Sequence, residues 1–299
     1  MKRALFIYNP LSGNRLVPRE LDRIIEKFQE NDIFLDMYRI AEDNSKIIEA
    51  MHRKDIDMII GAGGDGTIGN VANWMIKEGI KLPYGTLGTG TCNNFTHNID
   101  IPEDMEKAID IICQGHSYSV DVGIVNSKHR FLSSLAGGMF VEASFKTEPE
   151  LKQKLGPFAY YLKALSELAN LKSYPLEIDT GTDIYKENAY LVMILNGTHV
   201  GSFKRVFSES QIDISDGLME MLVLREGNPI EIANMFLMMM RGEDYLKSDS
   251  VLLLKSDYFK ISSTEKVNMS IDGEKGPMLP IEVEVRKQAI EVFVPKTKL

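Results

Sequence analysis

The fold is decided by one stretch, I-I-G-A-G-G-D-G-T at residues 59–67. The apolar run over residues 57–60 predicts a buried strand, and apolar residues spaced over 71–76 predict a helix. A strand, a glycine turn and a helix in this order can bring backbone N–H groups and a helix N-terminus against a phosphate. Glycine suits such a turn because a Cβ atom would block the approach of phosphate oxygens.

Asp65 is the unusual member of this stretch. The pattern lacks the Lys-Ser/Thr pair of a Walker motif and the spacing of a dinucleotide-binding fingerprint. A carboxylate beside a phosphate is repelled unless a cation lies between them, so Asp65 predicts a Mg²⁺–nucleotide site. The alternative is a tight structural turn with a solvated aspartate, because glycine is first of all a turn residue.

Composition narrows the class of protein. A chain of 299 residues has room for about two domains. Two cysteines, Cys92 and Cys113, are too few for a disulfide framework and fit a reducing cytoplasm. No apolar run approaches ~18 residues, so we expect no membrane span. The net charge of −9 argues against nucleic-acid partners, and any membrane contact would need a local patch.

Residues 1–124 alternate between predicted strands and predicted helices, which is typical of a parallel sheet covered by helices. The predicted strands are 4–8, 33–40, 57–60, 84–87 and 119–124, and the predicted helices are 21–28, 47–51, 71–76 and 105–112. Glycine-rich turns at Asn9–Gly13 and Gly88–Asn94 follow two of these strands. Ligands of open α/β sheets bind at such strand ends, although a plain polar loop is the alternative reading of the second turn.

Short β-type runs dominate after residue 124, including one at residues 131–136, and they indicate an antiparallel sandwich or barrel. Helical patterns remain at 157–171 and 229–240. We therefore expect an α/β + all-β protein. A three-layer α/β nucleotide-binding domain would span residues 1–124, and a β-sandwich substrate domain would span 125–299, with the extreme C-terminus returning to the first domain.

Three places in the second half could carry chemistry. Asp213 and Asp216 lie next to a glycine turn and could supply oxygen ligands to a hard cation, although an Asp-Gly hairpin is the commoner use. Glu274 follows another Asp-Gly turn and could act as a general base, or be a solvated hairpin residue. Lys163 could hold phosphate oxygens, although helix lysines are more often solvated surface.

Taken together, these pieces resemble the bacterial diacylglycerol kinase-like lipid kinases, in order and spacing, over nearly the whole chain. The motif G-G-D-G alone is shared with NAD kinases and phosphofructokinases, whereas seven motifs together are specific. They are N-P-L-S-G at 9–13, G-G-D-G-T at 63–67, G-T-C-N at 90–93, V-D-V-G at 120–123, G-P-F-A-Y-Y-L-K at 156–163, D-G-L at 216–218 and I-D-G-E at 271–274.

The resemblance implies that ATP binds the two turns of the first domain. The implied contacts are Asn9, Pro10, Ser12, Gly13, Gly63, Gly64, Asp65, Gly66 and Thr67, with Gly90 and Thr91 nearby. It also implies a structural Mg²⁺ held by the Asp216 carboxylate and main-chain oxygens of Asp213 and Leu218. Asp65 and Asp121 would reach the nucleotide Mg²⁺ through water and connect the domains, Lys163 would contact phosphate, and Glu274 would deprotonate the acceptor hydroxyl.

Departures from the family pattern bear on the substrate more than on the reaction class. Asn14 stands where a Lys or Arg is common, Gly69-Asn70 replaces Asn-Glu, and Asn94 replaces an aspartate. Diacylglycerol is the default acceptor, and phosphatidylglycerol or a sphingoid base is the closest alternative. A soluble acceptor such as NAD or a sugar phosphate, and a nucleotide-binding protein without turnover, remain further alternatives. We expect the protein in the cytoplasm, with transient contact at the inner membrane face. A homodimer is compatible with this expectation.

Overall fold

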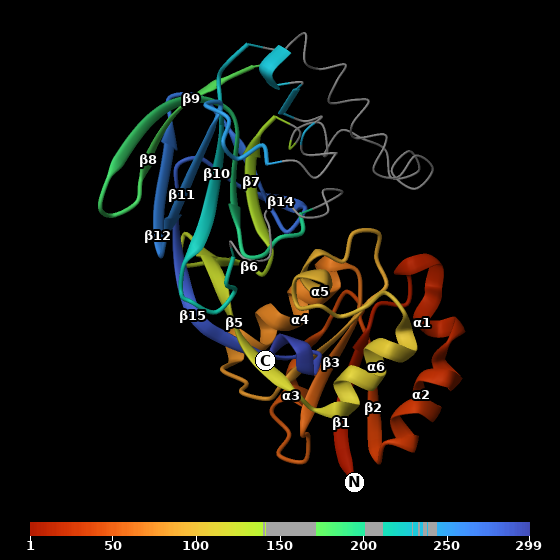
Figure 1. The fold of residues 1–299 in the computed structure, drawn as a ribbon. Helices are drawn as coiled ribbons and strands as arrows, with labels where there is room; N and C mark the ends of the chain where they lie inside the picture. Colours follow the sequence, from red (N-terminus) through yellow and green to blue (C-terminus); the bar gives the residue numbers. More distant parts are fainter. Residues whose placement is uncertain are drawn as a thin grey trace. The chain divides into compact units, whose positions relative to one another are not determined.

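The computed structural model describes residues 1–139, 141, 172–200, 212–228, 230–232, 234–235, 238 and 244–299. The chain forms two compact units (Figure 1). Unit 1 comprises Met1–Asp121 and Gln288–Leu299, and unit 2 comprises Val122–Lys287. Two long strands, β5 (Ser117–Val125) and β15 (Ile281–Phe293), contribute residues to both units.

Unit 1 is built on a parallel sheet in the order β2-β1-β3-β4, extended by the C-terminal part of β15. Its first four strands are β1 (Lys2–Tyr8), β2 (Ile33–Arg39), β3 (Met58–Gly63) and β4 (Tyr84–Gly88). Every residue of β3 is buried, as expected for a central strand covered on both faces.

Helices cover this sheet in two groups, because α2 packs with α6 and α3 packs with α4. The helices of unit 1 are η1 (Gly13–Arg15), α1 (Leu16–Arg19), α2 (Leu21–Glu30), α3 (Ser45–Met51), α4 (Asp65–Glu78), α5 (Asn94–Asn98), α6 (Met105–Gln114) and η3 (Lys296–Lys298). Helix α4 begins after Gly64 and ends at Gly79, whose φ of 68° is the left-handed conformation that commonly terminates helices. The α/β expectation for this half of the chain is confirmed.

Unit 2 is antiparallel. Its strands are β6 (His129–Phe131), β7 (Ser134–Gly138), β8 (Tyr174–Asp179), β9 (Ile184–Leu195), β10 (Met219–Arg225), β11 (Val251–Ser256), β12 (Tyr258–Ser263), β13 (Asn268–Ile271) and β14 (Glu274–Met278). The long strand β9 takes part in two sets of strand pairings. Its first half pairs with β8, which continues to β12 and β15, and its second half lies between β7 and β10.

The core of unit 2 lies between these two sets of strands. Met219, Met221 and Val223 of β10 enter one apolar cluster together with Phe259 and Ile261 of β12. The alternate residues Leu222 and Leu224 enter a second cluster with Ile232 and Met235. The two faces of β10 are therefore both buried, and the β-sandwich expectation is confirmed.

Candidate functional site

The turn after β1 forms the first wall of a candidate nucleotide site in unit 1. The side chain of Asn9 accepts from the Leu11 N–H at 3.0 Å, which closes a local Asx turn. Its Nδ2 lies 3.3 Å from Thr67 Oγ1, at the start of α4. Asn9 therefore ties the first predicted motif to the second.

The second wall is the N-terminus of α4. Gly64 precedes the helix in extended conformation, and its carbonyl accepts from the N–H groups of Thr67 and Ile68. The N–H groups of Asp65 and Gly66, the first two residues of the helix, have no intrahelical acceptor and carry the positive end of the dipole of a 14-residue helix. Such an end stabilises a phosphate group.

The third wall is the turn after β4, which lies directly against the other two. A Cβ atom placed on Gly90 would lie only 2.6 Å from the Cα of Gly64. Thr89 donates from its N–H to the Gly63 carbonyl at 2.8 Å and from its hydroxyl to Ser12 Oγ at 3.1 Å. A Cβ on Gly13, whose φ is +55°, would meet the Thr89 carbonyl oxygen. The predicted residues of all three turns are thus brought together by backbone contacts that only glycine allows.

The three turns present backbone amides and hydroxyl groups at the carboxyl ends of β1, β3 and β4, which is where ligands of parallel sheets bind. Asn93 clamps the third turn, because its Oδ1 accepts from the Gly90 N–H at 2.8 Å and its Nδ2 donates to the Gly90 carbonyl at 3.1 Å. Thr91 is exposed next to this clamp. The arrangement suits a phosphate chain held mainly by neutral donors.

Asp65 is half-buried at the first position of α4. Burial raises the pKa of its carboxyl, and hydrogen bonds from the backbone N–H groups of Asn94, Phe95 and Asn93 oppose that shift. The carboxylate therefore caps the N-terminus of the short helix α5. The sequence did not predict this capping role.

Asp121 lies on β5 and is fully buried. Its Oδ1 accepts from the backbone N–H of Gln288 at 2.7 Å, and Gln288 has a positive φ of 49° within β15. The carboxylate thus joins two strands that are far apart in the sequence. Lys163 lies outside the described residues.

In unit 2, the turn that contains Asp213, Asp216 and Leu218 is stabilised by its own side chains. Asp213 Oδ1 accepts from the N–H and hydroxyl of Ser215, both at 2.9 Å, and Asp216 Oδ1 accepts from the Leu218 N–H at 2.8 Å. The three predicted ligands therefore belong to one compact turn.

Lys255 of β11 is paired with this turn. Its ammonium lies 2.8 Å from Asp216 Oδ2 and 2.9 Å from Oε1 of Glu220, which it faces across β10 and β11. The hydrogen bond to Asp216 raises the pKa of Lys255, and burial raises the pKa of Glu220. Within the described part of the chain no three His, Cys, Asp or Glu side chains converge as a metal centre.

The turn nevertheless fits a hard cation in ligand type. The Lys255 ammonium is paired with the carboxylates of Asp216 and Glu220, and Asp213 adds a third carboxylate to the turn. Oxygen is the ligand atom that Mg²⁺ prefers. One carboxylate with main-chain oxygens is the donor set that this turn can offer.

Glu274 opens β14, directly after the hairpin turn that joins it to β13. Asp272 and Gly273 both have positive φ, 47° and 88°, as a two-residue Asp-Gly hairpin requires. Ile271 and Glu274 face each other across the hairpin, and the Glu274 side chain is exposed. A general base that must reach a substrate hydroxyl needs such access.

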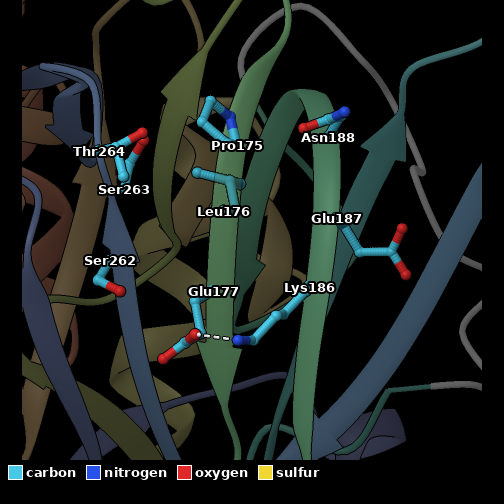
Figure 2. Close-up of a pocket in the computed structure, with 9 residues that line it drawn as sticks. All are labelled: Pro175, Leu176, Glu177, Lys186, Glu187, Asn188, Ser262, Ser263 and Thr264. Atoms are coloured by element: carbon cyan, nitrogen blue, oxygen red, sulfur yellow. Dashed lines mark ion pairs between the residues drawn. The ribbon is translucent and has the colours of Figure 1, made fainter.

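Figure 2 shows a pocket of about 420 Å³ on unit 2, lined by β8, β9 and β12. Its lining includes the ion pair of Lys186 with Glu177, at 3.1 Å, and the hydroxyl groups of Ser262 and Thr264. None of the predicted ATP, cation or base residues lines this pocket. The candidate site therefore rests on the turns described above.

Comparisons with known proteins agree with this geometry. Residues 3–125 match the family described as "Diacylglycerol kinase catalytic domain", and residues 136–294 match the "YegS C-terminal NAD kinase beta sandwich-like domain". A diacylglycerol kinase of Staphylococcus carnosus (strain TM300) is 32% identical over 99% of this chain and 96% of the relative. The chain belongs to the diacylglycerol kinase family.

Other members of the diacylglycerol kinase family support the same assignment. A diacylglycerol kinase of Staphylococcus aureus (strain JH9) is 31% identical over 98% of this chain and 93% of its own length. A solved structure from Bacillus anthracis str. Sterne, provisionally described as a diacylglycerol kinase, has a TM-score of 0.86 at 24% identity and covers 100% of this chain and 97% of its own. That likeness concerns the fold. By family, the protein is a lipid kinase, and a kinase of this family uses ATP.

The diacylglycerol kinase resemblance implied no role for four residues that hold the candidate site, although Asn93 is part of the G-T-C-N motif. Thr89 and Asn93 hold the third turn, and Lys255 and Glu220 hold the acidic turn. Thr89 and Asn93 lie inside a glycine-rich turn of the sequence, and this position alone could have marked them as site residues. Lys255 could not be found in this way, because its partners depend on the register of β10 with β11. No helix among the described residues is long and apolar enough to cross a membrane.

Proposed function

We propose that this protein transfers the γ-phosphoryl group of ATP to a lipid hydroxyl with the help of Mg²⁺, and that diacylglycerol is the acceptor and phosphatidic acid the product. The observation that carries the proposal is the close contact of three turns in unit 1, made by Gly90 against Gly64 and by Thr89 against Ser12. The names of the staphylococcal relatives support diacylglycerol as the acceptor.

On the donor side, the turns bind and orient the triphosphate. The amides at the start of α4 and the hydroxyl groups of Ser12, Thr67 and Thr89 would hold the phosphate oxygens, with further contacts from Asn9 to Gly13, Gly63 to Thr67, and Gly90 and Thr91. Phosphoryl transfer depends on alignment and charge neutralisation more than on a strong nucleophile. Preorganised backbone donors fulfil the first of these requirements.

On the acceptor side, Glu274 takes the proton of the lipid hydroxyl as this oxygen attacks the γ-phosphorus atom. The bond between the γ-phosphorus and the bridging oxygen breaks, and ADP leaves. A primary alcohol is poorly acidic, and a general base contributes about 10²–10⁴-fold to such a step. Lys163 would contact a phosphate oxygen.

Mg²⁺ supplies charge neutralisation at the nucleotide when it is bound. Asp65 and Asp121 would hold this ion through water molecules. A second, structural Mg²⁺ would be held by the Asp216 carboxylate and by main-chain oxygens of Asp213 and Leu218. Its function would be to stabilise the turn.

A lipid acceptor requires contact with a membrane. We propose that the protein reaches the inner membrane face from the cytoplasm, binds there transiently, and can do so as a homodimer. With a net charge of −9, a local patch must provide this contact, because the whole molecule would be repelled by anionic lipids.

The test is transfer of label from γ-labelled ATP to acceptors in mixed micelles. The panel contains diacylglycerol, phosphatidylglycerol, sphingosine and NAD, each with Mg²⁺ and with excess EDTA. We expect a labelled lipid from diacylglycerol and no product in EDTA. A labelled water-soluble product without any labelled lipid, or no product with any acceptor, contradicts the proposal.

A further inference from the structure

Asp272 holds a segment that is far from it in the sequence. Its Oδ2 accepts from the N–H of Leu132 at 2.8 Å, and its Oδ1 accepts from the N–H groups of Ser133 and Ser134 at 2.9 and 2.8 Å. Its own N–H donates to the Ser134 carbonyl at 2.8 Å. Hydrogen bonds to an ionised carboxylate are about twice as strong as those between neutral groups.

The segment that receives Asp272 is itself fixed. Leu132, Ser133 and Ser134 are buried; the first two separate β6 from β7, and Ser134 begins β7. From the end of β9, the backbone N–H of Asn196 donates to the Ser133 carbonyl at 2.9 Å, and its Nδ2 donates to the Leu132 carbonyl at 3.0 Å. The backbone of residues 132–134 is thus held twice: its N–H groups donate to Asp272, and the carbonyls of Leu132 and Ser133 accept from Asn196.

This arrangement differs from an ordinary Asp-Gly hairpin, in which the aspartate serves only its own turn. Asp179, in the Asp179-Thr180-Gly181 turn between β8 and β9, likewise serves its own turn, since it accepts from the nearby Gly181 N–H at 2.7 Å. The partners of Asp272 lie 138–140 residues away in the chain. Asp272 therefore docks its hairpin onto the body of unit 2.

Glu274 depends on this docking. Its side chain is exposed and makes no hydrogen bond or ion pair within the part of the chain that the structure describes, so only the backbone of the turn determines where its carboxylate lies. We infer that Asp272 is the positioning residue for Glu274: it fixes the hairpin so that the carboxylate meets the acceptor hydroxyl. This inference rests on the proposed role of Glu274 as the base.

The test is a double-mutant cycle of Asp272→Asn with Glu274→Gln, measured as kcat and KM for ATP at least 10 °C below the Tm of each variant. A misplacement of about 1 Å can cost about 10²-fold in rate. We expect Asp272→Asn to lower kcat about 10–100-fold with KM for ATP unchanged. In the Glu274→Gln background the same change should alter the residual rate less than about twofold, because Asp272 acts only through Glu274.

Asp179→Asn is the matched control, because it removes a carboxylate that accepts a backbone N–H at another hairpin of unit 2. It should keep kcat within about twofold of the unmodified protein. If Asp272→Asn does not fold, Asp272→Glu retains the charge and shifts the hairpin by about one methylene length. A lowered kcat in that variant supports the inference, and full activity overturns it.

Two further outcomes separate this inference from the function on which it rests. If Asp272→Asn lowers the rate by the same factor with and without Glu274, its role is only structural and the inference fails, while the kinase proposal stands. If Glu274→Gln alone keeps full activity, the proposed base is wrong, and the inference falls with it.

Discussion

Gly90→Ala is the sharpest perturbation of the candidate nucleotide site. The added Cβ would lie 2.6 Å from the Cα of Gly64 and 3.0 Å from Asn93 Oδ1. Real Cβ atoms keep at least 3.0 Å from other heavy atoms and ordinarily 3.4 Å or more. The two turns must therefore separate by about 0.4–0.8 Å, which are the differences between these limits and 2.6 Å.

The expected cost follows from this displacement. Inserting a methyl group into a closely packed site costs about 1–3 kcal/mol of unfolding free energy. The same movement displaces the amides of the third turn from the phosphate oxygens, so we expect KM for ATP to rise about tenfold, equivalent to about 1.4 kcal/mol of binding. Gly79→Ala is the matched control, because Gly79 has a φ of +68° but open space around it. It should lower stability by about 1–2 kcal/mol and leave KM for ATP unchanged.

Urea unfolding and ATP titrations of the two variants distinguish the effects. The reasoning is refuted if Gly90→Ala binds ATP as tightly as the unmodified protein. It is also refuted if Gly79→Ala weakens ATP binding to the same degree, because a general loss of stability would then explain both results.

Three other predictions concern charge and protonation. Lys255→Met leaves the buried Glu220 without its partner and should cost about 2–3 kcal/mol of unfolding free energy. This cost is below the range for a fully buried pair because the Lys255 side chain is 39% exposed. The control Lys186→Met, at an exposed ion pair, should hardly change the urea midpoint. Asp216→Asn should lower the Tm and abolish any rise of the Tm with added Mg²⁺, and an unchanged melting curve at all Mg²⁺ concentrations would exclude the structural ion. Burial raises the pKa of Cys113 to about 11, so its thiol is neutral at pH 8. The rate of iodoacetamide labelling should therefore rise about tenfold per pH unit up to pH 10. Labelling that is fast and independent of pH would contradict this prediction.

The architecture could be predicted from the sequence because its signals are local. Alternating strand and helix patterns identified the α/β half, and short β-type runs identified the sandwich. The predicted strand at 57–60 nevertheless extends to Gly63, and Gly61 is part of it. The hydroxyl of Tyr84 lies where a Cβ of Gly61 would be and donates to the Ile68 carbonyl at 3.0 Å. This glycine serves close packing within the sheet, although its place in the sequence looked like part of the turn.

Features that depend on distant partners could not be predicted in the same way. The run at 131–136 looked like one strand, but the structure divides it at residues 132–133, because Asp272 and Asn196 take the hydrogen-bonding groups there. The short helix α5 was not predicted either, because its N-terminus is capped by Asp65 rather than by a neighbour in the sequence. In both cases a carboxylate from elsewhere in the chain satisfies backbone N–H groups.

The most direct test of the central claim combines ATP binding and phosphoryl transfer in one variant, Glu274→Gln. The Kd for ATP should equal that of the unmodified protein, since the donor turns belong to unit 1 and Glu274 belongs to unit 2. Transfer of the γ-phosphoryl group to diacylglycerol should fall by about 10²–10⁴-fold. Transfer at the unmodified rate, or loss of ATP binding together with transfer, would contradict the account.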